Sequence, residues 1–144
     1  MAITLDGTTG ITTTNGDVYA EGNILGTVSQ TAGVPTGSIL EKGSDANGEY
    51  VRYADGTQIC WNYAAGNLAA NDATGSLFRT AATTTWTFPV AFIAAPVVTG
   101  STDTSVRWVS VGTATTTNAV FRHYAAITSA TTIGTTLMAI GRWY

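Results

Sequence analysis

The sequence predicts an all-β protein, in which a short β-rich N-terminal segment is followed by an antiparallel β-sandwich. Thr alone supplies about a fifth of the 144 residues, and Thr is one of the residue types enriched in strands. Only 10% of the residues are charged while 44% are hydrophobic, which is enough apolar material for one core. Short apolar runs separated by turn residues recur along the chain, a pattern typical of sandwiches and barrels.

The first part of the chain consists of short apolar runs separated by glycines. Asp6-Gly7 and Asn15-Gly16 are turn signals between these runs. Each run has room for only two or three strand residues, and strands this short do not form an independently stable sheet. We therefore expect this segment to pack against other chains through its apolar residues, which are Ile3, Leu5, Ile11, Val18, Tyr19, Ile24 and Leu25.

Residues 29–37 are small, polar and interrupted by Gly33, Pro35 and Gly37, as is typical of a linker. We place a domain boundary near residue 35. The two predicted units are an N-terminal attachment segment, residues 1–35, and a β-sandwich knob, residues 36–144. The strands beyond the boundary are expected to have a core of their own, so the knob is expected to fold without the attachment segment.

Within the knob, turn signals separate a series of strand candidates. These candidates are residues 38–41, 49–53, 57–63, 84–88, 95–101, 106–112, 119–125 and 135–143. Residues 64–82 carry a weaker pattern, in which residues 67–72 are compatible with one helical turn.

Residues 48–63, GEYVRYADGTQICWNY, form the best-defined pair of strands. Two runs of aromatic and β-branched residues flank Ala54-Asp55-Gly56, which predicts an antiparallel hairpin with Gly56 at positive φ. The hairpin carries no evident chemistry, so its expected role is to build the scaffold, with Trp61 or Tyr63 in the core. The chain ends on Trp143-Tyr144, which indicates a last strand tied into a sheet.

Composition argues against several partners. The six Lys and Arg residues are spread singly and the formal charge is −3, so no basic stripe is available to neutralise a nucleic-acid backbone. No run approaches the ~20 apolar residues that span a bilayer, and we expect neither membrane insertion nor a secretion signal. Cys60, the single cysteine, lies between Ile59 and Trp61 and is expected to be a buried structural side chain.

The residues available for catalysis are few and scattered. The chain has nine acidic residues and one histidine, and most of the acids lie in turns rich in Gly and Asn, where carboxylates accept backbone hydrogen bonds. No metal-ligand spacing, phosphate-binding loop or nucleophile elbow is present. The sequence predicts no enzyme, no cofactor and no metal; the enzymatic alternative is a carboxylate pair assembled across chains.

Alternation in residues 120–124, VFRHY, predicts which side chains of this strand share a face. Phe121 and His123 lie on one face, which Phe121 favours as the core face, whereas Arg122 and Tyr124 point toward solvent. A histidine in such a position is more often a hydrogen-bonded structural residue than a ligand contact.

In residues 106–111 the register leaves two assignments. Arg107 shares a face with two valines, so Trp108 faces outward if the valines face the core. An exposed Trp on a sheet is either an interchain packing residue or a platform for a ligand, and both interpretations stay open.

Several stretches together resemble the short fibre, spike and receptor-binding proteins of tailed bacteriophages. They are ITLDGTTGI at residues 3–11, GSILEKGS at 37–44 leading into the hairpin, and AIGRWY at 139–144. The stretch WTFPVAFIAAPVV at 86–98 is similar to a signature of H-type-lectin-like domains, which form the tips of such fibres. This resemblance implies a six-stranded antiparallel sandwich assembled as a homotrimer, with sugar sites near or between protomers.

These expectations combine into one hypothesis. The protein is a non-enzymatic component of the phage virion surface, made in the bacterial host cytoplasm, attached to other virion proteins by its N-terminal segment and contacting a host-surface saccharide through its knob. Sugar recognition needs a flat aromatic ring beside directional donors, so the saccharide-binding residues are expected among Arg107, Trp108, Arg122, His123 and Tyr124. The alternatives are a head-fibre, capsid-decoration or tail structural protein that binds no glycan, and a polysaccharide depolymerase.

Overall fold

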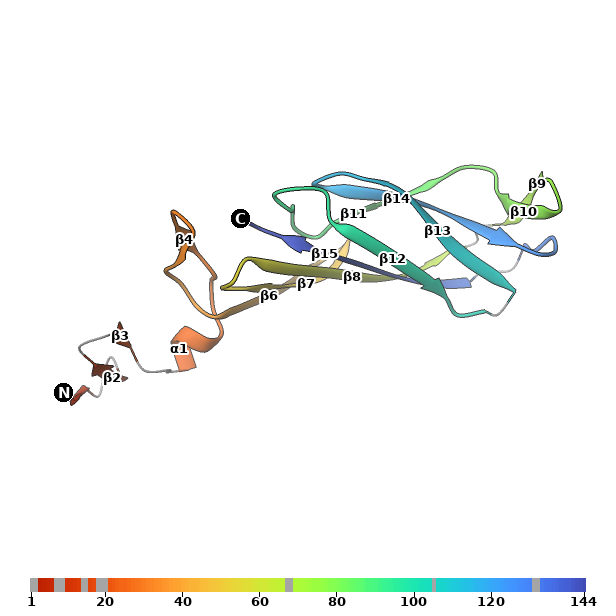
Figure 1. Cartoon of the computed structure of the whole chain (residues 1–144). Helices are drawn as coiled ribbons and strands as arrows, with labels where there is room; N and C mark the ends of the chain where they lie inside the picture. Colours follow the sequence, from red (N-terminus) through yellow and green to blue (C-terminus); the bar gives the residue numbers. More distant parts are fainter. Residues whose placement is uncertain are drawn as a thin grey trace.

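The computed structural model describes residues 3–6, 10–13, 16–17, 21–66, 69–104, 106–130 and 133–144, with side chains from residue 23 onward apart from those of residues 64–66. The predicted all-β class is confirmed. Within the described residues, the paired strands are all antiparallel, and the helix is one turn, α1 (Glu21–Ile24). Two larger sheets face each other as a sandwich (Figure 1).

The first sheet has five strands in the order β12-β15-β8-β7-β6. Their bounds are β6 (Leu40–Asp45), β7 (Gly48–Tyr53), β8 (Thr57–Gly66), β12 (Val97–Thr102) and β15 (Ile133–Arg142). Strands β8 and β15 pair along all ten residues of each strand, so they form the rigid centre of the sheet. The predicted hairpin is the β7–β8 pair, and Gly56 in its turn has φ +94°, as expected.

The second sheet is arranged around β14 (Asn118–Ala125). Strand β13 (Arg107–Ala114) pairs along one side of β14. Along the other side, β11 (Thr84–Thr87) and β10 (Leu77–Thr80) pair with β14 one after the other, and β9 (Ala70–Thr74) pairs with β10 at the edge. The sheet therefore has a long β13–β14 ribbon, and two short strands, β11 and β10, share the other side of β14.

The N-terminal part contains two small sheets. Strands β1 (Ile3–Asp6), β2 (Gly10–Thr13) and β3 (Gly16–Asp17) form a three-stranded sheet, and β4 (Gln30–Thr31) pairs with β5 (Val34–Pro35). Figure 1 shows both small sheets at the N-terminal end of the molecule. No described helix has the length and apolar character needed to cross a membrane.

The core lies between the two large sheets and is dominated by aromatic side chains. Trp86, Phe88 and Phe92 form a chain of edge-to-face contacts, with ring centroids 4.9 Å and 5.1 Å apart. Phe121 from β14 and Leu137 from β15 complete the cluster from opposite sheets. Along β14, buried and half-buried residues alternate without interruption, as a strand with one face on a core requires.

The structure corrects the prediction that Trp61 or Tyr63 lies in the core. Cys60 is fully buried, so the residues on either side of it point away from the interior, and Tyr63 is 62% exposed. The buried face of β8 is instead small and polar: Gln58 donates its side-chain amide to the carbonyls of Val90 and Ala91, at 3.1 and 3.3 Å. The loop that carries Phe88 and Phe92 already fills the space that an aromatic ring from β8 would need.

Cys60 itself is buried as predicted. Burial raises the pKa of its thiol to about 11, which outweighs the lowering effect of the hydrogen bonds from Gln58 and to the Val90 carbonyl. The thiol is therefore protonated at neutral pH and acts as a small packing group.

The predicted helical turn at 67–72 is wrong within the described residues, because strand β9 begins at Ala70. The sequence analysis also missed β10. These strands are short and polar, and they are held by pairing to each other and by the Arg79–Asp72 ion pair at 2.8 Å rather than by apolar alternation. With five strands in each large sheet, the six-stranded sandwich implied by the resemblance is corrected as well.

The predicted linker at 29–37 contains the β4–β5 hairpin, and hydrogen bonds cross the proposed boundary at residue 35. Ser38 donates its N–H to the Thr27 carbonyl and Ile39 donates to the Asn23 carbonyl, both at 3.0 Å. The Val28 N–H donates to a carboxylate oxygen of Glu41 at 3.0 Å. Residues 23–28 are therefore attached to the start of β6.

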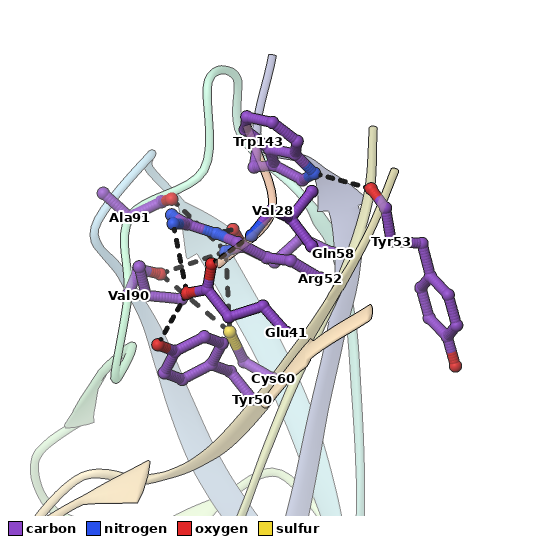
Figure 2. Close-up of polar contacts among 10 residues, drawn as sticks. All are labelled: Val28, Glu41, Tyr50, Arg52, Tyr53, Gln58, Cys60, Val90, Ala91 and Trp143. Carbon is purple, nitrogen blue, oxygen red and sulfur yellow. Dashed lines mark hydrogen bonds and ion pairs between the residues drawn. The ribbon is translucent and has the colours of Figure 1, made fainter. Parts of the chain in front are cut away.

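A polar network lies at the end of the sandwich where residues 23–28 meet the start of β6 (Figure 2). Glu41 accepts a hydrogen bond from the Tyr50 hydroxyl at 2.9 Å, and Arg52 donates to the Gln58 side chain at 2.9 Å. The last residues also anchor here, since the Trp143 indole donates to the Tyr53 carbonyl at 2.9 Å. The prediction of a tied-down C-terminal strand is confirmed, because β15 lies inside the sheet.

Candidate functional site

The outer face of the β13–β14 ribbon presents the aromatic residues that the sequence analysis selected. The register places Trp108 opposite Tyr124 and Ser110 opposite Arg122. The valines of β13 face the core side, so Trp108 points outward and is 43% exposed. The Trp108 and Tyr124 rings stack with centroids 6.2 Å apart and planes 15° apart, so the two aromatic side chains form one apolar patch.

Beside this pair lies a hollow of about 280 Å³. It is lined by Thr83, Ser110, Gly112, Val120, Arg122 and Tyr124, together with Phe121. The hollow exists because β13 contributes only small residues where β14 contributes large ones. A methyl group at Gly112 would lie 3.0 Å from a Val120 methyl carbon and would narrow the hollow.

Arg122 brings the only charged side chain in the lining of this hollow. Its Nη2 atom donates one long hydrogen bond, 3.4 Å, to the Ala81 carbonyl, while its Nε atom is buried without a partner. Arg79 on neighbouring β10 differs, because Asp72 neutralises it and holds the pKa of its guanidinium above the usual value. The hollow therefore combines the Tyr124 ring, the hydroxyl groups of Thr83 and Ser110 and a guanidinium group, and the Trp108 ring that contacts Tyr124 lies beside it.

Two of the five predicted saccharide-binding residues are not on this surface. Arg107 lies on the core face and is 3% exposed, with its Nη2 donating to the Ser129 carbonyl at 2.6 Å. His123 is fully buried and shares a 2.9 Å hydrogen bond with the Thr135 hydroxyl of the opposite sheet. The prediction is corrected for both: alternation turns them toward the interior, where a ligand on the surface does not reach them. The structural interpretation of His123 fits this position.

Acidification is expected to destabilise the fold through His123. Burial, and next the charge of Arg107, lower the pKa of this histidine below its ordinary value of about 6.5. The unfolded chain therefore binds a proton that the folded chain resists, and the free energy of unfolding falls as the pH drops from about 6.5 toward the folded pKa. Urea unfolding on either side of pH 6.5 measures this fall; the same fall in His123→Gln would contradict the assignment.

The predicted attachment residues are distributed over the N-terminal part. Ile3 and Leu5 lie in β1, with Leu5 opposite Ile11 of β2. Ile24, at the end of α1, and Leu25 are each 46% exposed. Val18 and Tyr19 lie outside the described residues.

A second surface, on the outer side of the five-stranded β12–β6 sheet, was missed by the sequence analysis. We call it the apolar face; it consists of Val51, Ile59, Trp61, Tyr63, Val97, Met138 and Ile140. Val97 is 74% exposed, and Met138 and Ile140 are each 44% exposed. The signal was present in the sequence, because every second residue around Cys60 belongs to one face, but Trp61 and Tyr63 were assigned to the core.

The apolar face is not flat, because it contains a hollow. A hollow of about 350 Å³ lies between the large side chains of Trp61 and Met138 and the small ones of Thr99, Ser101 and Thr136. Charged groups, Lys42 and Glu49, occur at the β6–β7 margin of the same side. Among the described residues, no group of His, Cys, Asp and Glu side chains is placed to hold a metal ion.

Three solved structures share this fold. The N-truncated R1-type pyocin tail fibre has a TM-score of 0.54 and 22% sequence identity, over 69% of this chain and 84% of that one. A C-terminal portion of the P. aeruginosa R1 pyocin fibre has a TM-score of 0.53 and 22% identity, over 71% of this chain and 28% of that one. The corresponding portion of the P. aeruginosa R2 pyocin fibre has a TM-score of 0.51 and 19% identity, over 72% and 26%.

This chain therefore matches most of the first structure and about a quarter of the other two. No family model matches the sequence, and no curated protein is significantly similar to it. The predicted likeness to phage fibre proteins is confirmed at the level of the fold, while the likeness to H-type lectins stays a prediction.

Proposed function

We propose that this chain is a fibre or spike component on the surface of a phage or phage-like particle, and that it acts by binding a host-surface saccharide, without catalysis. The observation that carries this proposal is the fold shared with pyocin tail fibres over about seventy per cent of the chain. The hollow on the β13–β14 ribbon supplies a surface suited to that task.

The residues of the hollow fit the chemistry of sugar recognition. Sugars present an apolar ring face that packs on flat aromatic groups, and hydroxyls that need directional donors and acceptors. The stacked Trp108–Tyr124 pair provides the first, and the hydroxyls of Thr83 and Ser110 beside Arg122 provide the second. The hollow is shallow, so each site is expected to bind weakly and several copies on one particle to bind tightly.

Replacing Trp108 or Tyr124 with alanine is expected to reduce adsorption to host cells by about tenfold or more per particle, because each change removes half of the stacked platform. Adsorption assays with labelled protein measure the loss. Tyr53→Ala is the matched control, since Tyr53 is an exposed aromatic residue on the other large sheet. Unchanged adsorption by folded Trp108→Ala and Tyr124→Ala variants would favour a structural fibre or decoration protein that binds no glycan.

The functional form under this proposal is a homotrimer whose copies meet through the apolar face. The sheet has five strands, and its two longest strands have ten residues. At ~3.4 Å per residue and ~4.8 Å between strands, the face covers at most ~800 Å². This is about the area that one partner contributes to a standard interface. Lys42 and Glu49 at the margin also allow opposite charges of neighbouring copies to pair.

The N-terminal segment serves as the attachment to other particle proteins in this proposal. Its strands β1, β2 and β3 have four, four and two residues, too few for an independently stable sheet. The hydrogen bonds between residues 23–28 and the start of β6 favour a boundary near residue 21, N-terminal to the predicted one. The knob in this arrangement comprises the two large sheets and the segment that leads into them.

A further inference from the structure

The charge of Arg122 is not compensated within the described part of the chain. There, carboxylates pair with Arg52 and Arg79, at 3.9 and 2.8 Å, and not with Arg122. The single hydrogen bond of Arg122 goes to a backbone carbonyl at 3.4 Å, a long distance for a guanidinium donor. Its buried Nε–H has no acceptor. A guanidinium group holds an anionic group through its N–H donors, and here Nη1 donates no hydrogen bond within the described residues while Nη2 makes only the long one to Ala81.

The surroundings of Arg122 favour a negative ligand. The lining of the hollow contains hydroxyl groups and apolar groups and no carboxylate, although the whole chain carries a formal charge of −3. Arg122 is half-buried and lines the hollow, where the lower effective dielectric strengthens its attraction for an opposite charge. The nearest other cation on this surface, Arg79, is already neutralised by Asp72. The guanidinium group of Arg122 is therefore, among the described residues, a positive charge without an anionic partner beside the Trp108–Tyr124 pair.

We propose that the hollow on the β13–β14 ribbon binds an acidic saccharide, with Arg122 pairing with the anionic substituent of the sugar while the Trp108–Tyr124 pair contacts its ring. The substituent is a carboxylate of a uronic-type sugar or a phosphate on a sugar; both carry a negative charge on oxygen atoms of one group, two of which accept hydrogen bonds from a guanidinium. This inference rests on the proposed saccharide-binding function and names the chemical class of its ligand.

The test compares acidic probes with neutral counterparts, using the full chain. The probes are a tetramer of galacturonic acid, the same tetramer after reduction of its carboxyl groups, and glucose 6-phosphate with glucose. Titration calorimetry is expected to show at least about tenfold tighter binding of an acidic probe than of its neutral counterpart, because hydrogen bonds to charged groups are the stronger class. The difference is expected to shrink as salt is added.

Variants assign the effect to Arg122. Arg122→Gln is expected to remove the preference for the acidic probe, whereas Lys42→Gln is expected to keep it. Both changes alter the net charge by the same amount, and Lys42 lies on the other large sheet. Preference for the galacturonate tetramer would identify the carboxylate as the ligand group, and preference for glucose 6-phosphate would identify the phosphate.

Equal affinity for acidic and neutral probes, or an acidic preference that survives in Arg122→Gln, would overturn the inference. Failure of the inference is distinct from failure of the proposed function. If Trp108→Ala abolishes host-cell adsorption while Arg122→Gln leaves it intact, the ligand is a neutral saccharide and only the inference is lost. If neither variant changes adsorption, both the inference and the proposed saccharide-binding function are excluded.

Discussion

Replacing Phe88 with alanine is expected to lower the free energy of unfolding by about 3–5 kcal/mol, the largest loss of any single change considered for this chain. Phe88 is 4% exposed and stands between Trp86 and Phe92, with its ring edge-to-face with both. Its removal deletes the buried ring, breaks both aromatic contacts and leaves a cavity between two sheets that cannot close over it. The Phe88→Ala chain is therefore expected to be marginally folded at best, since domains of this size have only about 5–15 kcal/mol of stability.

Urea unfolding followed by tryptophan fluorescence measures the loss, because Trp86 reports directly on this cluster. Tyr53→Ala provides the comparison for an exposed aromatic residue and is expected to change the free energy of unfolding by no more than about 0.5 kcal/mol. Similar losses in the two variants would show that the loop carrying Phe88 does not form part of the core.

Replacing Ile140 with glutamate is expected to convert the proposed trimer into monomers without unfolding the chain. Ile140 lies in the central row of the apolar face, between Val97 and Ile59 on the neighbouring strands. A carboxylate there is solvated in the monomer but would be desolvated and unpaired in an interface, which costs several kcal/mol per copy. The position is 44% exposed in a single chain, so the fold itself tolerates the change.

Light scattering at micromolar concentration measures the expected fall of the mass to about one third. Ile127→Glu is the matched control, because Ile127 is 59% exposed and lies in the loop after β14, away from the apolar face. If the parent chain is monomeric, the proposed trimer is excluded. If Ile140→Glu remains trimeric, the copies meet through another surface.

Most of the β-structure was predictable because its signals are local. The hairpin at 48–63 follows from two β-rich runs around a turn with a glycine, and the chain forms β7 and β8 there. The missed strands β9 and β10 show the limit of this approach. Asn71, Asp72 and Arg79 do not alternate with large apolar residues, and an edge hairpin of this kind depends on its pairing with β14 at Phe78 and Arg79.

The residues of the candidate site were also predicted only in part. Alternation in β14 placed Arg122 and Tyr124 on one face and His123 on the other, and this assignment holds in the structure. In β13 the sequence left two assignments open, and the structure has the one in which the valines face the core side and Trp108 faces outward. Arg107 is buried for the same reason, because it shares the face of those valines. Its long charged side chain made it a surface candidate, but its head group lies inside, where Nη2 donates to the Ser129 carbonyl.

The sequence by itself therefore determined the all-β class, the principal hairpin and the pairing of side chains by face within each strand. Only the tertiary structure decided which face of β8 looks inward. Alternation separates Cys60 from Trp61 and Tyr63, but it does not say which set meets the opposite sheet, because that depends on the volume already filled by Phe88 and Phe92 from another part of the chain. The small Cys60 side chain therefore lies in the interior, and the large side chains of Trp61 and Tyr63 form part of the apolar face.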